Sequence, residues 1–240
     1  MGVLIDVLII MIILSGAYIG FRRGIITQGF SFVGMIIIFL IAYYTKGFLS
    51  ALLMQFMPFI NINIGTVQSV QMLNILFYEI VAFVFIFAVL FTGFQILMRF
   101  TEVFEAILKG TIVLALPLKL GGLVVGAIQY TVIVLLGIII LISPIFHLGI
   151  IRESTIANTL LRVSKISFMP TNNLITALDQ LEDIREISRH RDHNETELTV
   201  LRVMLANRIT TVNQVENLVE SGRITVDDVE SVLSQFREEE

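Results

Sequence analysis

The sequence predicts an all-α membrane protein, with four transmembrane helices followed by a small soluble helical tail. Of its 240 residues, 56% are hydrophobic and only 15% are charged, whereas soluble globular domains carry about 25% charged residues. Residues 1–150 hold six basic and four acidic side chains, and residues 151–240 hold ten basic and sixteen acidic ones. We therefore predict a transmembrane domain over 1–150 and an acidic soluble tail over 151–240.

Four apolar stretches are long enough to cross a bilayer, which takes about 20 residues of helix. They cover about 3–20, 28–46, 75–98 and 120–143. The alternation typical of barrel strands is missing, so helices are the expected spanning structure. A signal peptide would begin with basic residues, and Met1-Gly2-Val3 does not. The first stretch is therefore expected to be a retained anchor.

The short connections indicate an orientation, because cytoplasmic loops collect Lys and Arg. The basic residues follow the first and third spans: Arg22, Arg23, Arg99, Lys109 and Lys119. The connection over 47–74 carries no basic residue. We expect the first and third connections inside and both termini outside. If the segment 104–118 dips into the bilayer instead, the tail would lie inside.

Arg22 and Arg23 have a second interpretation beside this topological one. They could bind anionic lipid headgroups, or pair with Glu102 or Glu105 in the neighbouring inner connection. Replacing both by Gln is expected to loosen the orientation of the first hairpin, which a reporter fused between the first two spans would detect.

The connection over 47–74 is unusually apolar, and Pro58 follows its hydrophobic part. Either a short amphipathic helix lies in the membrane interface, or these side chains form a packed cap over the helix ends. The segment 102–118 has a similar pattern on the other side of the membrane.

Asp6 and Glu79 are acids about one turn into the first and third spans, and our topology places both near the outer boundary. An acid in hydrocarbon usually faces a protein interior, an aqueous cavity or a partner, which would suit a proton or cation site. Alternatively, each is an interfacial carboxylate stabilised at a helix N-terminus. Gln95 and Gln129 are expected to form hydrogen bonds between helices.

Glycines recur every four residues in two spans. Gly16, Gly20 and Gly24 share one helical stripe, and Gly122 and Gly126 repeat the spacing in the fourth span. Glycine lets helix backbones approach closely in a membrane. We expect a packing seam between the first and fourth helices, or between two copies of the chain.

The tail is expected to be helical. Residues 173–189 have amphipathic spacing, and 195–207 form a further expected helix, after a break at Pro170-Thr171-Asn172. The segment 211–219 is repeated at 225–233, and each copy begins with a capping-box pattern at Thr211 and Thr225. This predicts a C-terminal helical hairpin that packs on the preceding helices or contacts another chain.

No pattern for catalysis, a cofactor or a metal emerges, so we expect no enzyme. There is no cysteine, no phosphate-binding glycine loop and no nucleophile elbow. His190 and His193 with Asp192 are too few ligands for a tetrahedral metal site. The acidic tail disfavours nucleic acid as a partner.

The first span and its exit resemble the colicin V production protein family, over about residues 1–165. The resemblance is carried by Asp6, by Gly20-Phe21-Arg22-Arg23-Gly24, by the segment from Pro117 to Gly126 and by Glu153-Ser154. It implies a bacterial inner-membrane protein linked to toxin production or export and to envelope homeostasis, without an established activity. The acidic tail is not part of the family's shared pattern.

Two functions follow as hypotheses. The first is a non-enzymatic membrane protein that supports secretion and envelope function, with the lipid bilayer, further copies of itself and a protein bound by the tail as its partners. The second is a small proton- or cation-linked transporter or channel that uses Asp6 and Glu79.

Overall fold

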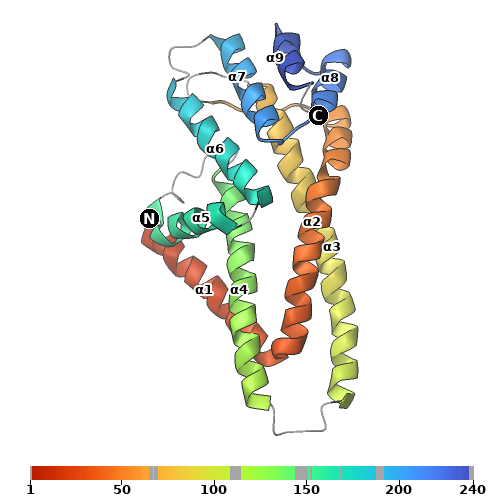
Figure 1. The fold of residues 1–240 in the computed structure, drawn as a ribbon, viewed down its shortest axis with the longest axis vertical. Coiled ribbons are helices and arrows are strands. Elements are labelled where there is room, and N and C mark those ends of the chain that lie inside the picture. Colours follow the sequence, from red (N-terminus) through yellow and green to blue (C-terminus); the bar gives the residue numbers. More distant parts are fainter. Residues whose placement is uncertain are drawn as a thin grey trace. The chain divides into compact units, whose positions relative to one another are not determined.

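The computed structural model describes residues 2–64, 67, 70–108, 115–143, 151, 153–167, 169–187 and 192–237. Most of them are helical, and the β-structure among them is one isolated bridge between Ile64 and Val67. The helices in chain order are α1 (Gly2–Arg23), α2 (Ile25–Phe56), α3 (Met72–Leu108), α4 (Ala115–Leu141), α5 (Thr155–Ser167), α6 (Met169–Ile187), α7 (His193–Ala206), α8 (Val212–Glu220) and α9 (Val229–Phe236) (Figure 1). The predicted all-α fold class is confirmed.

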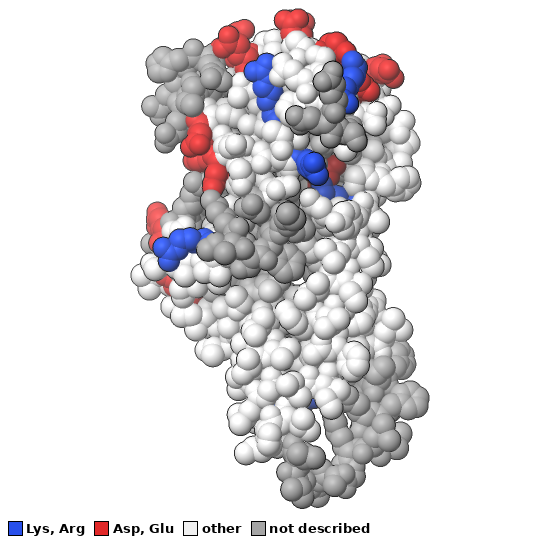
Figure 2. All heavy atoms as spheres, viewed as in Figure 1, with Lys and Arg blue, Asp and Glu red and all other residues white. Residues whose placement is uncertain are grey.

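Four of these helices, α1 to α4, are long and apolar enough to cross a membrane. On the face drawn in Figure 2, charged side chains gather on the tail helices, while the apolar helices show almost none. The helices α2 and α3 are 32 and 37 residues long, which corresponds to about 48 and about 55 Å at 1.5 Å per residue. Both exceed the hydrocarbon thickness of about 30 Å.

Of the two interpretations of 47–74, the described residues fit the packed cap and form no separate amphipathic helix. Helix α2 continues to Phe56 without a break, because the first strong helix breaker after Lys46 is Pro58. The residues that follow pack as a cap, with Ile62, Ile64 and Val70 buried. In the second apolar connection, 102–118, helix α3 likewise continues as far as Leu108. Residues 109–114 lie outside the described part of the chain.

The chain forms two compact units. The first comprises Met1–Tyr44, Val84–Leu141 and Leu148–Val163, and the second comprises Thr45–Phe83, Ile142–His147 and Ser164–Glu240. The ends of α2 and α3 thus belong to the same unit as α6 to α9. The predicted boundary near residue 150 is one between apolar and water-soluble sequence, and it stays a prediction.

In the first unit, α1 packs closely along α4. A single non-helical residue, Gly24, separates α1 from α2. Its φ of +82° lies in the left-handed region that glycine adopts without strain. Arg22 and Arg23 form the last turn of α1 rather than a loop.

In the second unit, large aliphatic side chains from the helix ends and from the tail form one core. The fully buried ones include Met54, Met72, Leu73, Ile75, Leu76, Ile175, Leu178, Leu181 and Leu201. The amphipathic helix expected at 173–189 corresponds to α6 up to Ile187, with 188 and 189 outside the described residues, and the helix expected at 195–207 corresponds to α7. The break predicted at 170–172 is wrong: these residues form the first turn of α6, where proline is tolerated, and α5 ends before them at Ser167.

The predicted repeat of the capping box is half right. Thr211 caps α8 and forms a complete capping box with Gln214. At the second copy α9 begins only at Val229, after Asp228 in the left-handed region, and no side chain caps it. Thr225 instead exchanges hydrogen bonds with Gln71: its N–H donates to Oε1 at 3.1 Å, and its Oγ1 accepts from Nε2 at 3.3 Å.

Candidate functional site

The buried acid Glu79 is the centre of a polar network in the second unit. It lies on α3, is 3% exposed, and forms an ion pair with Lys46 of α2 through Oε2. Its other oxygen, Oε1, accepts a hydrogen bond from the hydroxyl of Ser50 at 2.5 Å. Lys46 and Ser50 are four residues apart and therefore face the same side of α2. The pairing offsets much of the penalty of burying a charge.

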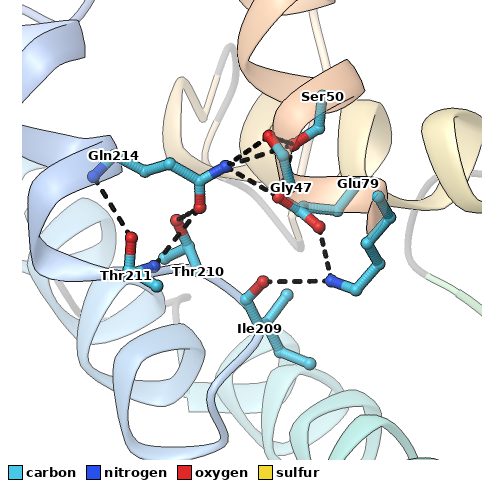
Figure 3. Close-up of polar contacts among 8 residues, drawn as sticks. Gly47, Ser50, Glu79, Ile209, Thr210, Thr211 and Gln214 are labelled. Carbon is cyan, nitrogen blue, oxygen red and sulfur yellow. Dashed lines mark hydrogen bonds and ion pairs between the residues drawn. The ribbon is translucent and has the colours of Figure 1, made fainter. Parts of the chain in front are cut away.

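Gln214 of α8 completes this network (Figure 3). Its Nε2 donates to Glu79 Oε1 at 3.0 Å, to Ser50 Oγ at 3.2 Å and to the carbonyl oxygen of Gly47 at 3.3 Å. Its Oε1 accepts from the hydroxyl of Thr210 at 3.0 Å and from the N–H of Thr211 at 3.4 Å. One side chain thus both caps α8 and binds Glu79, so the start of α8 and its docking are coupled.

Lys46 reaches the same part of the tail. Besides its ion pair with Glu79, its Nζ donates to the carbonyl oxygen of Ile209, just before α8, at 3.4 Å. In the described part of the chain, the Glu79 carboxylate thus accepts from Lys46 and Ser50 of α2 and from Gln214 of α8. This arrangement can hold the tail in place, and charge assistance strengthens its hydrogen bonds.

An acid of the tail caps the start of α3. Glu197 of α7 is fully buried, and its two oxygens accept the N–H groups of Gln71 at 2.6 Å and Met72 at 2.9 Å. These amides have no partner within the helix, and the positive end of the helix dipole favours a carboxylate there. Burial raises the pKa of the Glu197 carboxyl, while the two N–H groups and His193, at 3.6 Å, oppose that rise.

An arginine of the tail binds the C-terminal end of α2. Arg223, which follows α8, donates from Nη2 to the carbonyl oxygen of Gln55 and from Nη1 to that of Met57 at 3.3 Å. Both carbonyls are at the C-terminus of α2, where the helix dipole favours a cation. The tail thus places an acid at the start of α3 and a base at the end of α2.

Asp6 has a different role in the first unit. Its Oδ1 accepts the hydroxyl of Ser154 at 2.5 Å and the N–H of Ile156 at 3.0 Å. Ser154 Oγ in turn accepts the N–H of Ala157 at 3.0 Å. Asp6 therefore caps the N-terminus of α5 together with Ser154. Asp6 and Glu79 belong to different units and, among the described residues, share no partner.

Gln129 lies in a buried amide cluster of the first unit. Gln28 of α2 donates to Gln129 Oε1 at 2.6 Å, and Gln129 Nε2 donates to Ser31 Oγ at 3.2 Å. Gln95 also donates to Ser31 Oγ, at 3.3 Å. The Oε1 atom of Gln28 is buried and has no hydrogen-bond partner in the described part of the chain. Gln28 and Ser31 did not emerge from the sequence alone.

The candidate packing glycines come together between α1 and α4. A Cβ atom on Gly20 would overlap the carbonyl oxygen of Gly122, and one on Gly126 would overlap that of Gly16. A Cβ on Gly122 would also collide with the backbone of Gly24. A Cβ on Gly16 would meet the ring of Tyr130 instead. The two backbones are therefore close enough to exclude any side chain at three of these positions.

The two arginines differ in their surroundings. Arg22 is exposed, and Arg23 donates from Nη1 to Gln95 Oε1 at 3.4 Å. The side chains of Glu102 and Glu105 lie outside the described residues, so the predicted pairing with them is untested. His190 also lies outside. Among the described residues, no three His, Asp or Glu side chains are placed to hold a metal ion.

The comparisons with known proteins return one family. The sequence pattern described as Colicin V production protein matches residues 5–165. The match covers the four apolar helices and nearly all of α5, and it ends before α6 to α9. No curated protein and no solved structure matches the chain.

Proposed function

The chain belongs to the Colicin V production protein family and is a multi-pass membrane protein involved in toxin production; from this premise we propose how it acts. It supports toxin production or secretion, and envelope homeostasis, without catalysing a reaction. It does so as an assembly of several copies in the bacterial inner membrane and through its tail, which binds a protein partner. Both termini lie outside, which the basic residues Arg22 and Arg23 support.

The single observation that carries this proposal is that the buried Glu79 carboxylate is bound by side chains of α2 and α8. An acid in an apolar helix is a candidate for ion or proton chemistry. Here its carboxylate accepts bonds from Lys46, Ser50 and Gln214. The contacts hold α8 on the ends of two spanning helices. This supports a role in positioning the tail for a partner rather than a role in transport.

A small proton- or cation-linked transporter or channel is the second candidate. The feature that favours it is the amide cluster of Gln28, Gln95 and Gln129, which joins three apolar helices and includes a buried oxygen without a partner among the described residues. Asp6 and Glu79 would be its charged groups.

Toxin release by cells that depend on this chain tests the first proposal. We expect Gln214→Ala to lower toxin release at unchanged membrane abundance, because α8 loses its contacts with Glu79 and Ser50. Asn213→Ala is the matched control, since its exposed side chain lies beside Gln214 on the same helix. Equal release by both variants would contradict the proposed role of the tail.

Flux in proteoliposomes tests the second candidate. The non-transport proposal expects no proton or cation flux from the purified chain. A flux that Asp6→Asn and Glu79→Gln abolish, with the assembly of the protein intact, would overturn it in favour of a transporter.

A further inference from the structure

Helix α2 presents one continuous exposed apolar stripe from Phe30 to its last residue, Phe56. Its members recur every three or four residues, which places them on one face of the helix: Phe30, Val33, Ile37, Ile41, Tyr44, Phe48, Leu52 and Phe56. Phe48 and Phe56 are 83% and 72% exposed. The stripe is therefore longer than the roughly twenty residues of helix that a membrane span requires.

The length of this stripe matches a complete bilayer rather than its hydrocarbon core. From Phe30 to Phe56 the helix rises by about 39 Å. The hydrocarbon core measures about 30 Å, and the bilayer with its interfacial regions about 40–45 Å. The end of the stripe, from Phe48 to Phe56, thus fits the level of the lipid glycerol and ester groups.

At this end of α2, the second unit contains an open groove of about 570 Å³ between α2 and α8. This volume lies within the range of small-molecule pockets, about 300–1,000 Å³. Phe48, Ala51 and Leu52 form an apolar wall on α2, and Asn217 and Leu218 contribute to the wall on α8. The wall on α2 continues the exposed apolar stripe of that helix, and large exposed apolar patches mark protein or membrane contact sites.

The charges of the groove indicate which part of a lipid it would contact. Of its described lining residues, Glu220 alone carries a charge, and no Lys or Arg is among them. An anionic headgroup would require positive charge. The apolar wall on α2 suits a lipid acyl chain. The polar side chains of Asn217 and Ser221 suit the ester oxygens of that lipid.

We propose that the groove between α2 and α8 binds a phospholipid by its acyl chain, with no preference for headgroup charge. The lipid-facing stripe of α2 continues into the groove, so the occupant is the same lipid that covers the helix in the bilayer. The binding site is independent of whether the chain transports a solute or positions a partner.

Tryptophan fluorescence can test this directly, because the chain contains no tryptophan. Phe48→Trp introduces one indole at an exposed position that accepts it. In phosphatidylcholine vesicles with brominated acyl chains, we expect its emission to fall by about the same factor as that of Ile37→Trp, on the membrane-spanning part of the stripe. Phe236→Trp on α9 is the control. We expect soluble acrylamide to quench its emission and brominated lipid to leave it unchanged.

Asn217→Trp examines the second wall of the groove. A chain bound between the walls quenches this variant as well, and equally in phosphatidylcholine and phosphatidylglycerol vesicles. If brominated lipid quenches Phe48→Trp but not Asn217→Trp, the groove holds no lipid and the proposal is wrong. Quenching of Phe48→Trp by acrylamide alone would show water there, and quenching by neither agent would show a protein cover such as a second copy. Either result overturns the proposal.

Discussion

The two units of the chain are held together by different physical means. In the first, α1 and α4 meet through glycines at backbone distance, and the described buried polar side chains are all uncharged: Thr27, Gln28, Ser31, Gln129 and Ser154. In the second, bulky aliphatic side chains form the core, and charged groups join helix ends to the tail. Lipid surrounds membrane helices with a medium as apolar as their side chains, so close backbone contact replaces the hydrophobic effect as the source of association. The second unit uses the burial and charge pairing of a water-soluble protein.

The largest effect is expected from leaving one charge of the second unit unpaired. Lys46→Met leaves the buried Glu79 carboxylate without its ion-pair partner. It should lower the free energy of unfolding of the second unit by about 3–5 kcal/mol. Denaturant unfolding in detergent, followed by amide exchange in each unit, measures it. The double variant Lys46→Met with Glu79→Met should recover much of the loss. If it is as unstable as the single variant, the ion pair is not the cause.

A smaller effect is expected from the glycine seam of the first unit. Gly20→Ala forces its Cβ into the Gly122 carbonyl oxygen, and backbone cannot move aside as a flexible side chain can. We expect a loss of about 1–3 kcal/mol, confined to exchange in α1 and α4. Gly29→Ala is the matched control, because nothing lies within 4 Å of a Cβ at that position. Equal stability of both variants would refute the seam.

The smallest effect is a pH dependence in the second unit. Burial raises the pKa of the Glu197 carboxyl in the folded chain above its ordinary value of 4.5. The stability it contributes is therefore fully present below the unfolded pKa and is lost as pH rises through the folded pKa. Amide exchange at Gln71 and Met72 should accelerate over that range. Glu197→Gln should remove this dependence, and a variant that keeps it would assign the titration to another group.

The fold class follows from local composition, and the long-range contacts do not. Hydropathy identifies four spans, and a capping box identifies the start of α8 at Thr211. Gln214 also binds Glu79, which lies 135 positions away in the sequence. No local sequence pattern encodes such a pair. The same applies to Glu197 and Arg223, whose partners are backbone groups of α3 and α2.

Two differences from the sequence-based expectations have a physical explanation. The span expected over 28–46 lies inside α2, and this helix continues to Phe56 because no proline interrupts it before Pro58. The capping box expected at Thr225 failed because the residue instead forms two hydrogen bonds with Gln71. At Thr225 a tertiary contact therefore decided between two local alternatives.

The central claim, that the Glu79 network holds α8 on the helix ends, is tested most directly by amide hydrogen exchange of residues 212–220. The double variant Lys46→Met with Glu79→Met removes the ion pair and one of the three acceptors of Gln214 Nε2 without leaving a buried charge. Our account predicts faster exchange throughout α8 in this variant, and no change in α8 for Gln28→Met with Gln129→Met, the matched pair in the first unit. Parental exchange rates in α8 of the first double variant would contradict the account.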